Sequence, residues 1–194
     1  MKTIVVAQQK GGVGKTTLAL NVALYFARNG ANVAIADADA QGSLTASADL
    51  LEGLRLVSVQ EVFNGKAEAD LVVIDTSPRN DADLPKVLAL ADFVLVPVKP
   101  GYLDVLALKD TQAILQQAGI KKAGIVLNMV QHRNAVTREV QELLQGFSIP
   151  LMTTQIFQRV AYTRSTMTNG VFGSDDAKAQ AEIENLADEI LENL

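Results

Sequence analysis

The sequence predicts an α/β fold, a doubly wound and mostly parallel sheet with helices on both faces. Short runs such as residues 3–7 (TIVVA) and 71–75 (LVVID) are apolar without the alternation of a half-exposed strand, which is typical of strands buried on both faces. Longer segments with apolar residues at helical spacing lie between these runs. This alternation favours parallel strands joined by right-handed crossovers, so the loops that follow the strands meet at one edge of the sheet, where ligands bind.

Length and composition are typical of one globular domain that spans residues 1–194. Hydrophobic residues make up 48% of the chain, which argues against disorder. The absence of cysteine excludes a disulfide scaffold and a thiolate metal site. No apolar run approaches the ~20 residues of a membrane span, and the chain starts with a strand rather than a signal peptide. We therefore expect a cytoplasmic protein with no membrane partner.

The first strand leads into the run KGGVGKTT, residues 10–17, and a helix is predicted from residue 16 to about 29. A glycine-rich turn between a strand and a helix N-terminus gathers backbone N–H groups at one point, which is how a chain binds a polyphosphate. Lys15 can reach the outer phosphates, and the Thr16 hydroxyl can ligate Mg²⁺. A turn that only closes the strand–helix unit is the alternative. The predicted phosphate-binding residues are Gly11, Gly12, Val13, Gly14, Lys15, Thr16 and Thr17.

One position departs from the general phosphate-loop signature: Gln9 occupies the place of its first glycine, and a second lysine, Lys10, follows. With this lysine the run resembles the deviant Walker A motif of the ParA/MinD family of ATPases, and the Gln-Gln-Lys-Gly-Gly start resembles the ParA branch. The resemblance implies an ATP-dependent homodimer in which two subunits enclose two ATP molecules and Lys10 of each reaches the partner's nucleotide. A cation supplied in trans makes hydrolysis depend on assembly, as an arginine finger does.

A second buried strand, residues 33–36, is followed by Asp37-Ala38-Asp39. Two carboxylates one residue apart beside a phosphate loop suit the positioning of Mg²⁺ and water. The segment resembles the family's Asp-x-Asp-Pro-Gln-Gly switch, with Ala40 in place of proline. By that resemblance, Asp39 would orient or activate the attacking water and Asp37 would lie near the Mg²⁺ shell. A solvated Asp-rich loop is the alternative.

Residues 54–57 are predicted as a short edge strand and residues 59–63 as a helical turn. The strand 71–75 ends in Asp75, a Walker B arrangement in which one carboxylate holds a Mg²⁺-bound water. A role for Asp75 in capping the following turn is the alternative. Residues 76–83 are then expected to form a second switch loop close to the γ-phosphate.

Residues 93–98 are predicted as a central strand whose regular pairing ends at Pro97, because proline lacks the N–H group of a ladder. A helix follows from residue 102 to about 118. Its apolar residues are most simply interpreted as a core face, whereas in the family the Val-Pro-Val-x-Pro segment that this run resembles lies at the dimer face. The residues assigned to the core face are Leu103, Leu106 and Ile114.

The next strand, residues 123–127, is followed by Asn128. An amide offers both a donor and an acceptor, which matches the adenine edge, and in the family an asparagine near this place contacts the base. A side chain that fastens its own loop is the alternative. Asn134 is predicted to cap a helix that ends near residue 145, and a last short strand follows residues 147–152.

The formal net charge of the chain is -5, but the charged residues are distributed unevenly along it. Residues 121–170 contain six basic and two acidic side chains, a balance of +4, whereas residues 171–194 contain one lysine and seven acids, a balance of -6. In ParA relatives, basic residues of the C-terminal part bind DNA through its phosphates, and solvated arginines without a function are the alternative. The candidate DNA contacts are Lys121, Lys122, Arg138, Arg159 and Arg164.

The tail, residues 175–194, is predicted to be a helix that packs on the sheet. Its acidic residues would be repelled by an anionic membrane surface, which separates the chain from the MinD branch, whose last helix is basic and amphipathic. No helix-turn-helix segment precedes the first strand, so we expect no sequence-specific reading of DNA.

Together these features predict an ATPase that uses ATP and Mg²⁺, forms a homodimer and, as a dimer, binds double-stranded nucleoid DNA without sequence preference. A ParB-like partition adaptor, or an equivalent partner protein, would stimulate hydrolysis. The leading interpretation is that this ATPase cycle drives plasmid or chromosome partition. The alternative is that the same cycle positions a protein cargo such as a microcompartment or receptor cluster. Two other classes stay open: an ATP-dependent small-molecule ligase on the same fold, and a nucleotide-gated structural protein that hydrolyses little ATP.

Overall fold

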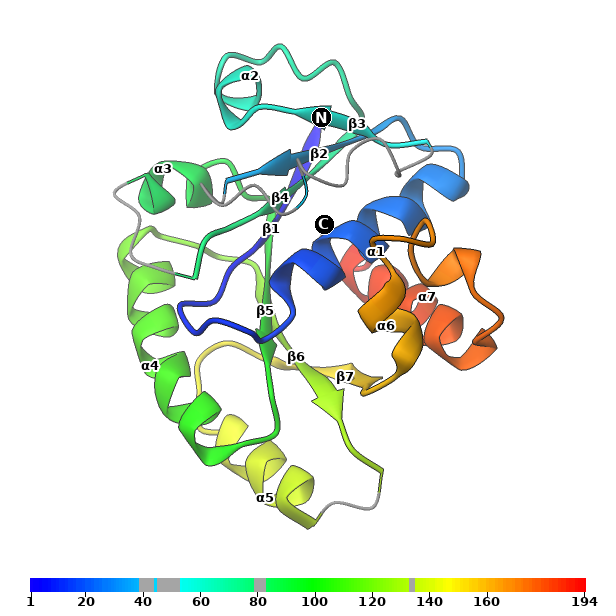
Figure 1. Cartoon of the computed structure of the whole chain (residues 1–194). Coiled ribbons are helices and arrows are strands. Elements are labelled where there is room, and N and C mark those ends of the chain that lie inside the picture. The colour runs from blue at the N-terminus through cyan, green and yellow to red at the C-terminus, as the bar shows by residue number, and fades with distance from the viewer. Residues whose placement is uncertain (39–43, 45–52, 79–82, 133–134) are drawn as a thin grey trace.

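The computed structural model of the chain describes residues 1–38, 44, 53–78, 83–132 and 135–194. Its described strands form one sheet in the order β3-β2-β4-β1-β5-β6-β7, and all neighbours in it are parallel. Helices cover both faces, as in the doubly wound fold that the sequence predicts (Figure 1). The strands are β1 (Lys2–Val6), β2 (Val33–Asp37), β3 (Arg55–Val57), β4 (Leu71–Asp75), β5 (Phe93–Val98), β6 (Ala123–Val130) and β7 (Leu151–Phe157). The helices are α1 (Lys15–Arg28), α2 (Val59–Phe63), α3 (Leu84–Leu88), α4 (Tyr102–Gln117), α5 (Ala135–Leu144), α6 (Val160–Arg164) and α7 (Ala177–Leu191), with a 3₁₀ turn η2 (Val171–Gly173).

Alternate residues of the buried strands enter two separate cores, one on each face of the sheet. On one face Ile4 and Val73 belong to the core that contains α1 and α7. On the other face Val5 and Ile74 belong to the core that contains α3, α4 and α5. The two groups of helices lie on opposite sides of the sheet in Figure 1. Burial on both faces explains why these strands lack an alternating pattern.

The central strands end level with one another. Val6 of β1 is paired with Asp75 of β4, and Asp37 of β2 is paired with the same residue. The last residues of three adjacent strands therefore lie in one row at the C-terminal edge of the sheet. The loop between β1 and α1 leaves from this edge.

Most predicted elements are confirmed, and two strands are longer than predicted. β4 and β5 have the predicted bounds, and β3 is the predicted edge strand beside β2. β6 continues past Asn128 to Val130, and β7 is an edge strand seven residues long. Polar residues such as the exposed Thr153 and the half-buried Gln155 lie within β7, so no apolar run marks its length. Asn134, the predicted helix cap, lies outside the described residues.

Pro97 does not end the pairing of β5, so that prediction was wrong. β5 stays paired with β6 as far as Val98. The backbone groups of successive residues in a strand point to alternate neighbours, and the carbonyl of Leu95 accepts a hydrogen bond from Ala7 on the β1 side. Pro97 therefore faces the same side, beyond the end of β1, where its carbonyl accepts a hydrogen bond from Gln8 Nε2 at 3.5 Å. The N–H group that Pro97 lacks would point past the end of β1, so its absence removes no hydrogen bond between β5 and β1 or between β5 and β6.

The predicted core face of α4 was wrong for two of its three residues. Leu103 is 70% exposed and Leu106 is 39% exposed, while Ile114 is half-buried against the core. Both the exposed set and the buried set recur at helical spacing, so periodicity alone does not select between them. The residues that α4 buries are Asp104, Val105, Leu108, Thr111 and Leu115.

The C-terminal helix α7 packs on the sheet at β7, as predicted, and also on α1 (Figure 1). Its Glu189 also fastens the edge strand, because the carboxylate accepts hydrogen bonds from the backbone N–H groups of Thr153 at 2.7 Å and Thr154 at 3.0 Å. Burial raises the pKa of Glu189, but the hydrogen bonds from Thr153 and Thr154 outweigh burial and leave the pKa below its ordinary value. Among the helices that the structure describes, none is long and apolar enough to cross a membrane.

The segment between α6 and α7 is joined to α1. The buried Asn21 Oδ1 accepts a hydrogen bond from the N–H group of Val171 at 2.7 Å. Gly170 has a φ of +75°, and a Cβ atom at this position would lie 2.5 Å from Leu24 Cδ1. Position 170 therefore requires glycine for its backbone conformation and for the space beside α1.

Gly170→Ala is expected to lower the free energy of unfolding by ~2–4 kcal/mol, because a left-handed backbone strain adds to an overlap with Leu24. Gly119→Ala is the matched control, since Gly119 has a φ of +70° but nothing within 4 Å of an added Cβ atom. The control should lose only ~1–2 kcal/mol. Urea unfolding followed by circular dichroism measures both values. Equal losses would contradict a packing role for position 170.

Candidate functional site

The loop between β1 and α1 has the backbone of an anion-binding turn. Gly12 and Gly14 have φ values of +70° and +91°, and a Cβ atom at Gly14 would overlap Nδ2 of Asn128. Gly11 differs, since an added Cβ atom would meet only Pro78 at an ordinary 3.6 Å. Gly11 and Gly12 are both exposed. The described chain therefore does not require glycine at position 11, and the exposed backbone there leaves space for a phosphate group or a second molecule to approach closely.

The helix α1 begins at Lys15 without a capping side chain. Gly14 is its N-cap residue and offers no side-chain hydrogen bond, and its first turn contains no acid. Ser58 caps α2 and Asp176 caps α7, whereas α3, α4 and α6 also begin without a side-chain cap. The first N–H groups of this 14-residue helix and the positive end of its dipole are therefore at the loop, where they suit an anion. Lys15, 6% exposed, adds its charge at the base of the same loop.

A hydroxyl group and two carboxylates gather where α1 begins. Thr16 Oγ1 donates a hydrogen bond of 2.5 Å to Oδ2 of Asp75, which is 1% exposed. Asp37 is the neighbour of Asp75 in the sheet, and its Oδ2 accepts a hydrogen bond from the N–H group of Leu44 at 3.0 Å. An all-oxygen set of this kind fits Mg²⁺, which takes one or two protein ligands and completes its shell with phosphate and water. In the described ranges no group of three or more His, Cys, Asp or Glu side chains is arranged to hold a metal.

The two predicted switch segments are described only in part. Asp39 and Ala40 lie outside the described residues, so the role of Asp39 stays a prediction. The second segment starts against the phosphate loop, because Thr76 Oγ1 donates to the carbonyl of Val6 at 2.9 Å and Pro78 lies beside Gly11. Residues 79–82 again lie outside the described part of the chain.

Asn128 lies beneath the phosphate loop and is 4% exposed. Its Nδ2 donates to the carbonyl of Val13 at 2.7 Å, and its Oδ1 accepts from the N–H group of Met129 at 2.9 Å. The first bond joins the phosphate loop to β6, and the second lies within β6, so Asn128 does not fasten a loop of its own, which was the alternative left open by the sequence. Contact between Asn128 and adenine stays a prediction.

The helix α4 holds the start of the phosphate loop, which the sequence analysis did not anticipate. Lys10 Nζ and Asp104 Oδ2 form an ion pair at 2.9 Å. Gln8 Oε1 accepts hydrogen bonds from the Thr111 hydroxyl and from the N–H group of Lys10, and Thr111 Oγ1 accepts one from the N–H group of Gln9 at 3.3 Å. Two signals in the sequence point to these contacts: a glutamine directly after a buried strand, and an acid in the first turn of an otherwise apolar helix segment.

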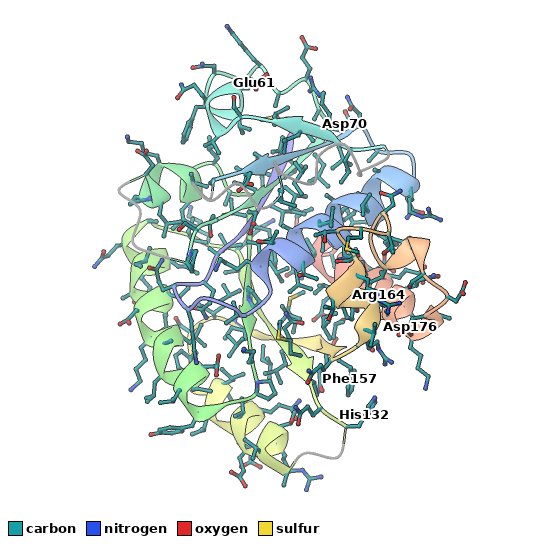
Figure 2. All side chains as sticks on the ribbon, viewed as in Figure 1. Glu61, Asp70, His132, Phe157, Arg164 and Asp176 are labelled. Atoms are coloured by element: carbon teal, nitrogen blue, oxygen red, sulfur yellow. The ribbon has the colours of Figure 1, made fainter. Side chains whose placement is uncertain are left out.

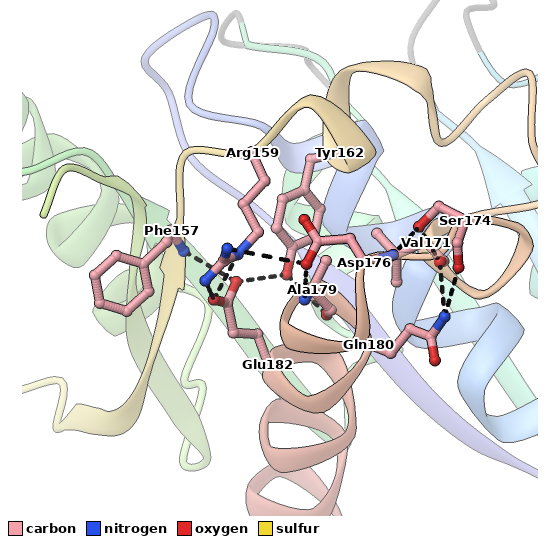
Figure 3. Close-up of polar contacts among 9 residues, drawn as sticks. All are labelled: Phe157, Arg159, Tyr162, Val171, Ser174, Asp176, Ala179, Gln180 and Glu182. Atoms are coloured by element: carbon pink, nitrogen blue, oxygen red, sulfur yellow. Dashed lines mark hydrogen bonds and ion pairs between the residues drawn. The ribbon is translucent and has the colours of Figure 1, made fainter.

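A half-buried carboxylate, Glu182 of α7, organises the chain after β7 (Figure 3). Its Oε1 accepts two hydrogen bonds from Arg159, at 2.8 and 2.6 Å, and its Oε2 accepts one from the Tyr162 hydroxyl at 2.9 Å and one from the N–H group of Phe157 at 3.1 Å. The hydrogen bond to Glu182 raises the pKa of the Arg159 guanidinium group. The pKa of the Tyr162 hydroxyl is also raised, mainly by burial and to a smaller extent by the negative charge of Glu182. Arg159 is therefore an internal partner of Glu182, and we do not retain it as a DNA contact.

The five basic residues that were grouped by sequence do not form one surface. Lys121 and Lys122 precede β6 and thus lie at the edge of the sheet opposite the phosphate loop, where Lys122 Nζ donates to the carbonyl of Leu194 at 3.2 Å. Arg138 is exposed on α5, whose core contacts are on one face of the sheet. Arg164 is exposed on α6, which packs on the other face (Arg164 is labelled in Figure 2). Proximity in sequence therefore did not predict proximity in space.

Comparisons with known proteins agree with this geometry. The family model described as "CobQ/CobB/MinD/ParA nucleotide binding domain" matches residues 4–170. Maintenance of carboxysome distribution protein A of Halothiobacillus neapolitanus is 31% identical over 209 residues, which cover 97% of this chain and 96% of that protein. The chromosome-partitioning ATPase Soj of Thermus thermophilus is 29% identical over 190 residues, which cover 75% of this chain and 76% of that protein.

A solved structure shares the fold. The crystal structure of a putative plasmid partition protein of Borrelia burgdorferi bound to AMPPNP superposes with a TM-score of 0.80 at 19% identity, and the match covers 100% of this chain and 99% of that one. The family match includes the phosphate loop, Asp75 and Asn128. The chain therefore belongs to the CobQ/CobB/MinD/ParA nucleotide-binding domain family, in its ParA-like branch.

Proposed function

We propose that the protein is a ParA-type ATPase that forms a homodimer around two ATP molecules with Mg²⁺ and uses the cycle of assembly and hydrolysis to position a cargo. The observation that carries the proposal is Lys10, a second lysine at the rim of a loop whose own lysine, Lys15, lies buried at its base. The side chain of Lys10 is 32% exposed. It therefore has access to a second molecule at the same edge of the sheet.

Exposed residues around Lys10 support a dimer surface here. Tyr102 and Leu103, in the first turn of α4, are 63% and 70% exposed. They directly precede Asp104, the ion-pair partner of Lys10. Large apolar side chains beside an exposed glycine loop suit a surface that another protein covers. The family resemblance supports a second copy of the chain as that protein.

The residues of the site have complementary roles in this proposal. The loop N–H groups and Lys15 would hold the phosphates, and Thr16 with Asp75 would hold Mg²⁺, whose charge offsets that of the phosphate oxygens. Asp39 would orient the attacking water. Lys10 of the partner would offset the charge that develops on the γ-phosphoryl group, so that hydrolysis requires the dimer.

The dimer would bind double-stranded DNA without sequence preference and would associate with the nucleoid. Exposed cations such as Arg138 and Arg164 support this part of the proposal, because phosphate contacts need accessible positive charge. A partner protein, ParB-like or equivalent, would stimulate hydrolysis and release the dimer from DNA.

Two cargo classes are supported by different relatives. Similarity to a carboxysome distribution protein over nearly the whole of both chains favours a protein microcompartment as the cargo. Similarity to Soj over about three quarters of both chains favours a chromosome or plasmid. A gene for a DNA-binding adaptor next to this one would support partition, and genes for shell proteins would support a microcompartment.

Asn128→Ala should weaken ATP binding by about tenfold, because the carbonyl of Val13 loses a buried donor and the space behind Gly14 opens. Asn32→Ala is the matched control, since Asn32 also donates from Nδ2 to a backbone carbonyl, that of Glu68 at 2.9 Å, but at an exposed site. Titration with a fluorescent ATP analogue measures both affinities. Equal affinities in the two variants would show that Asn128 does not organise the loop.

Lys10→Ala should leave ATP binding to the monomer intact and reduce partner-stimulated hydrolysis by about 10³-fold or more, the range known for cations supplied in trans. Phosphate release and sedimentation with ATP are the measurements. Asp39→Ala is the complementary variant and should accumulate as an ATP-bound dimer, because its nucleotide is held but not hydrolysed.

Unchanged dimerisation, DNA binding and turnover in Lys10→Ala would refute the positioning switch. Turnover that depends instead on an added small metabolite would support a ligase. ATP-dependent assembly with little hydrolysis in the wild-type protein, even with its partner protein present, would support the nucleotide-gated structural protein.

The protein should be retained on any long DNA duplex in ATP and not in ADP, and retention should fall steeply as salt is added. Arg164→Ala should reduce the slope of log affinity against log salt by about one unit for each phosphate that this arginine neutralises. Electrophoretic mobility shifts over a salt series provide the measurement. Lys178→Ala, which removes a lysine from α7, is the control for net charge. Retention that ignores the nucleotide, or none at low salt, would contradict DNA binding.

A further inference from the structure

The ion pair between Lys10 and Asp104 is uneven in its exposure. The lysine side chain is 32% exposed, whereas that of the aspartate is 12% exposed. Asp104 Oδ1 is buried and, among the residues that the structure describes, has no hydrogen-bond partner. Lys10 is therefore the cation that offsets the carboxylate of Asp104, and its departure would be costly because a buried charge without a partner is strongly unfavourable.

The surrounding chain leaves room for this contact and holds the loop by other means. Gly101 has no side chain, and a Cβ atom there would lie 2.9 Å from the same Asp104 oxygen that binds Lys10. The backbone before Lys10 is fixed by Gln8, Gln9 and Thr111. The loop can thus keep its backbone position while the Lys10 side chain moves between two partners.

We propose that Asp104 is a positioning residue that holds Lys10 in cis in the monomer. Assembly around ATP transfers the Lys10 ammonium group from Asp104 to the partner's nucleotide. This inference rests on the proposed function, since it requires that Lys10 act in trans. The pair opposes assembly in the absence of ATP, because no phosphate is then present to replace the carboxylate.

Asp104→Asn tests this role, because the amide keeps the shape of the carboxylate and removes its charge. The variant releases Lys10 and also removes the unpaired buried charge that assembly would otherwise leave behind. It should dimerise at an AMPPNP concentration about 5- to 30-fold lower than the wild-type protein needs, as measured by analytical ultracentrifugation. Asp110→Asn is the matched control, since Asp110 is an exposed acid on the same helix.

A chemical readout reports the pair directly in the nucleotide-free monomer. Brief acetylation of lysines followed by mass spectrometry should show Lys10 several-fold more reactive in Asp104→Asn than in the wild-type protein. Lys109, exposed on α4, should react equally in both and serves as the internal reference. Gly101→Ala, which crowds the carboxylate without changing its charge, should shift Lys10 reactivity in the same direction.

The outcomes separate this inference from the proposed function. If Lys10→Ala abolishes assembly but Asp104→Asn changes neither assembly nor Lys10 reactivity, Asp104 only fastens α4 and the inference is overturned alone. If Lys10→Ala assembles, binds DNA and hydrolyses ATP as the wild-type protein does, the trans role of Lys10 fails, and both proposals are overturned. In Lys10→Ala/Asp104→Asn, the second substitution should no longer favour assembly; an effect that persists there would show that Asp104 acts through another group and would also overturn the inference.

Discussion

The level register of β1, β2 and β4 is the constraint on which the site depends. Because Val6, Asp37 and Asp75 are paired in one row, the phosphate loop and two carboxylates reach one edge without a flexible arm. A slip of one residue would turn Asp75 to the other face of the sheet and break its hydrogen bond with Thr16. The two cores oppose such a slip, since each buried strand residue packs into one of them. Apolar packing far from the loop thus sets the geometry of the polar edge.

Two carboxylates at this edge are buried, and each is paired with a single side chain that also lies at the phosphate loop. Asp75 is 1% exposed and bonds to the Thr16 hydroxyl, and Asp104 is 8% exposed and pairs with Lys10. In the proposed function, a nucleotide with Mg²⁺ would bring charges of both signs and so would offset the loss of such contacts. Glu182 differs, because four donors of the chain itself occupy both of its oxygens. That carboxylate is suited to holding the fold together, not to exchange.

The sequence predicts the parts of the structure in which local pattern and tertiary role agree. β4 with its terminal Asp75 and the glycine loop fall in this class, because an apolar run and a motif each carry the information locally. The exposed Leu103 does not, because two apolar stripes on α4 have the same period and only the packed fold selects the buried one. The partners of Lys10 and Arg159 were not predicted, because they are acids 94 and 23 positions away in the chain. The position of Asp104 in an apolar helical turn marks a candidate buried acid, but it does not identify the cation that the acid meets. An ion pair between residues far apart in the chain produces no periodic pattern, so a single sequence does not predict it.

The exposure of α4 gives this helix a second role beside its part in the core. Thr111 contacts the residues before the phosphate loop, Asp104 contacts Lys10, and Leu103 in the same turn faces solvent. A molecule that covers Leu103 must therefore approach Lys10, and any movement of Lys10 changes the surroundings of a buried carboxylate on the same turn. Assembly and loop chemistry would be coupled through elements in direct contact, with no extended pathway. Had Leu103 faced the core as its spacing allowed, α4 would support the sheet alone, and the surface beside Lys10 would lack its apolar centre.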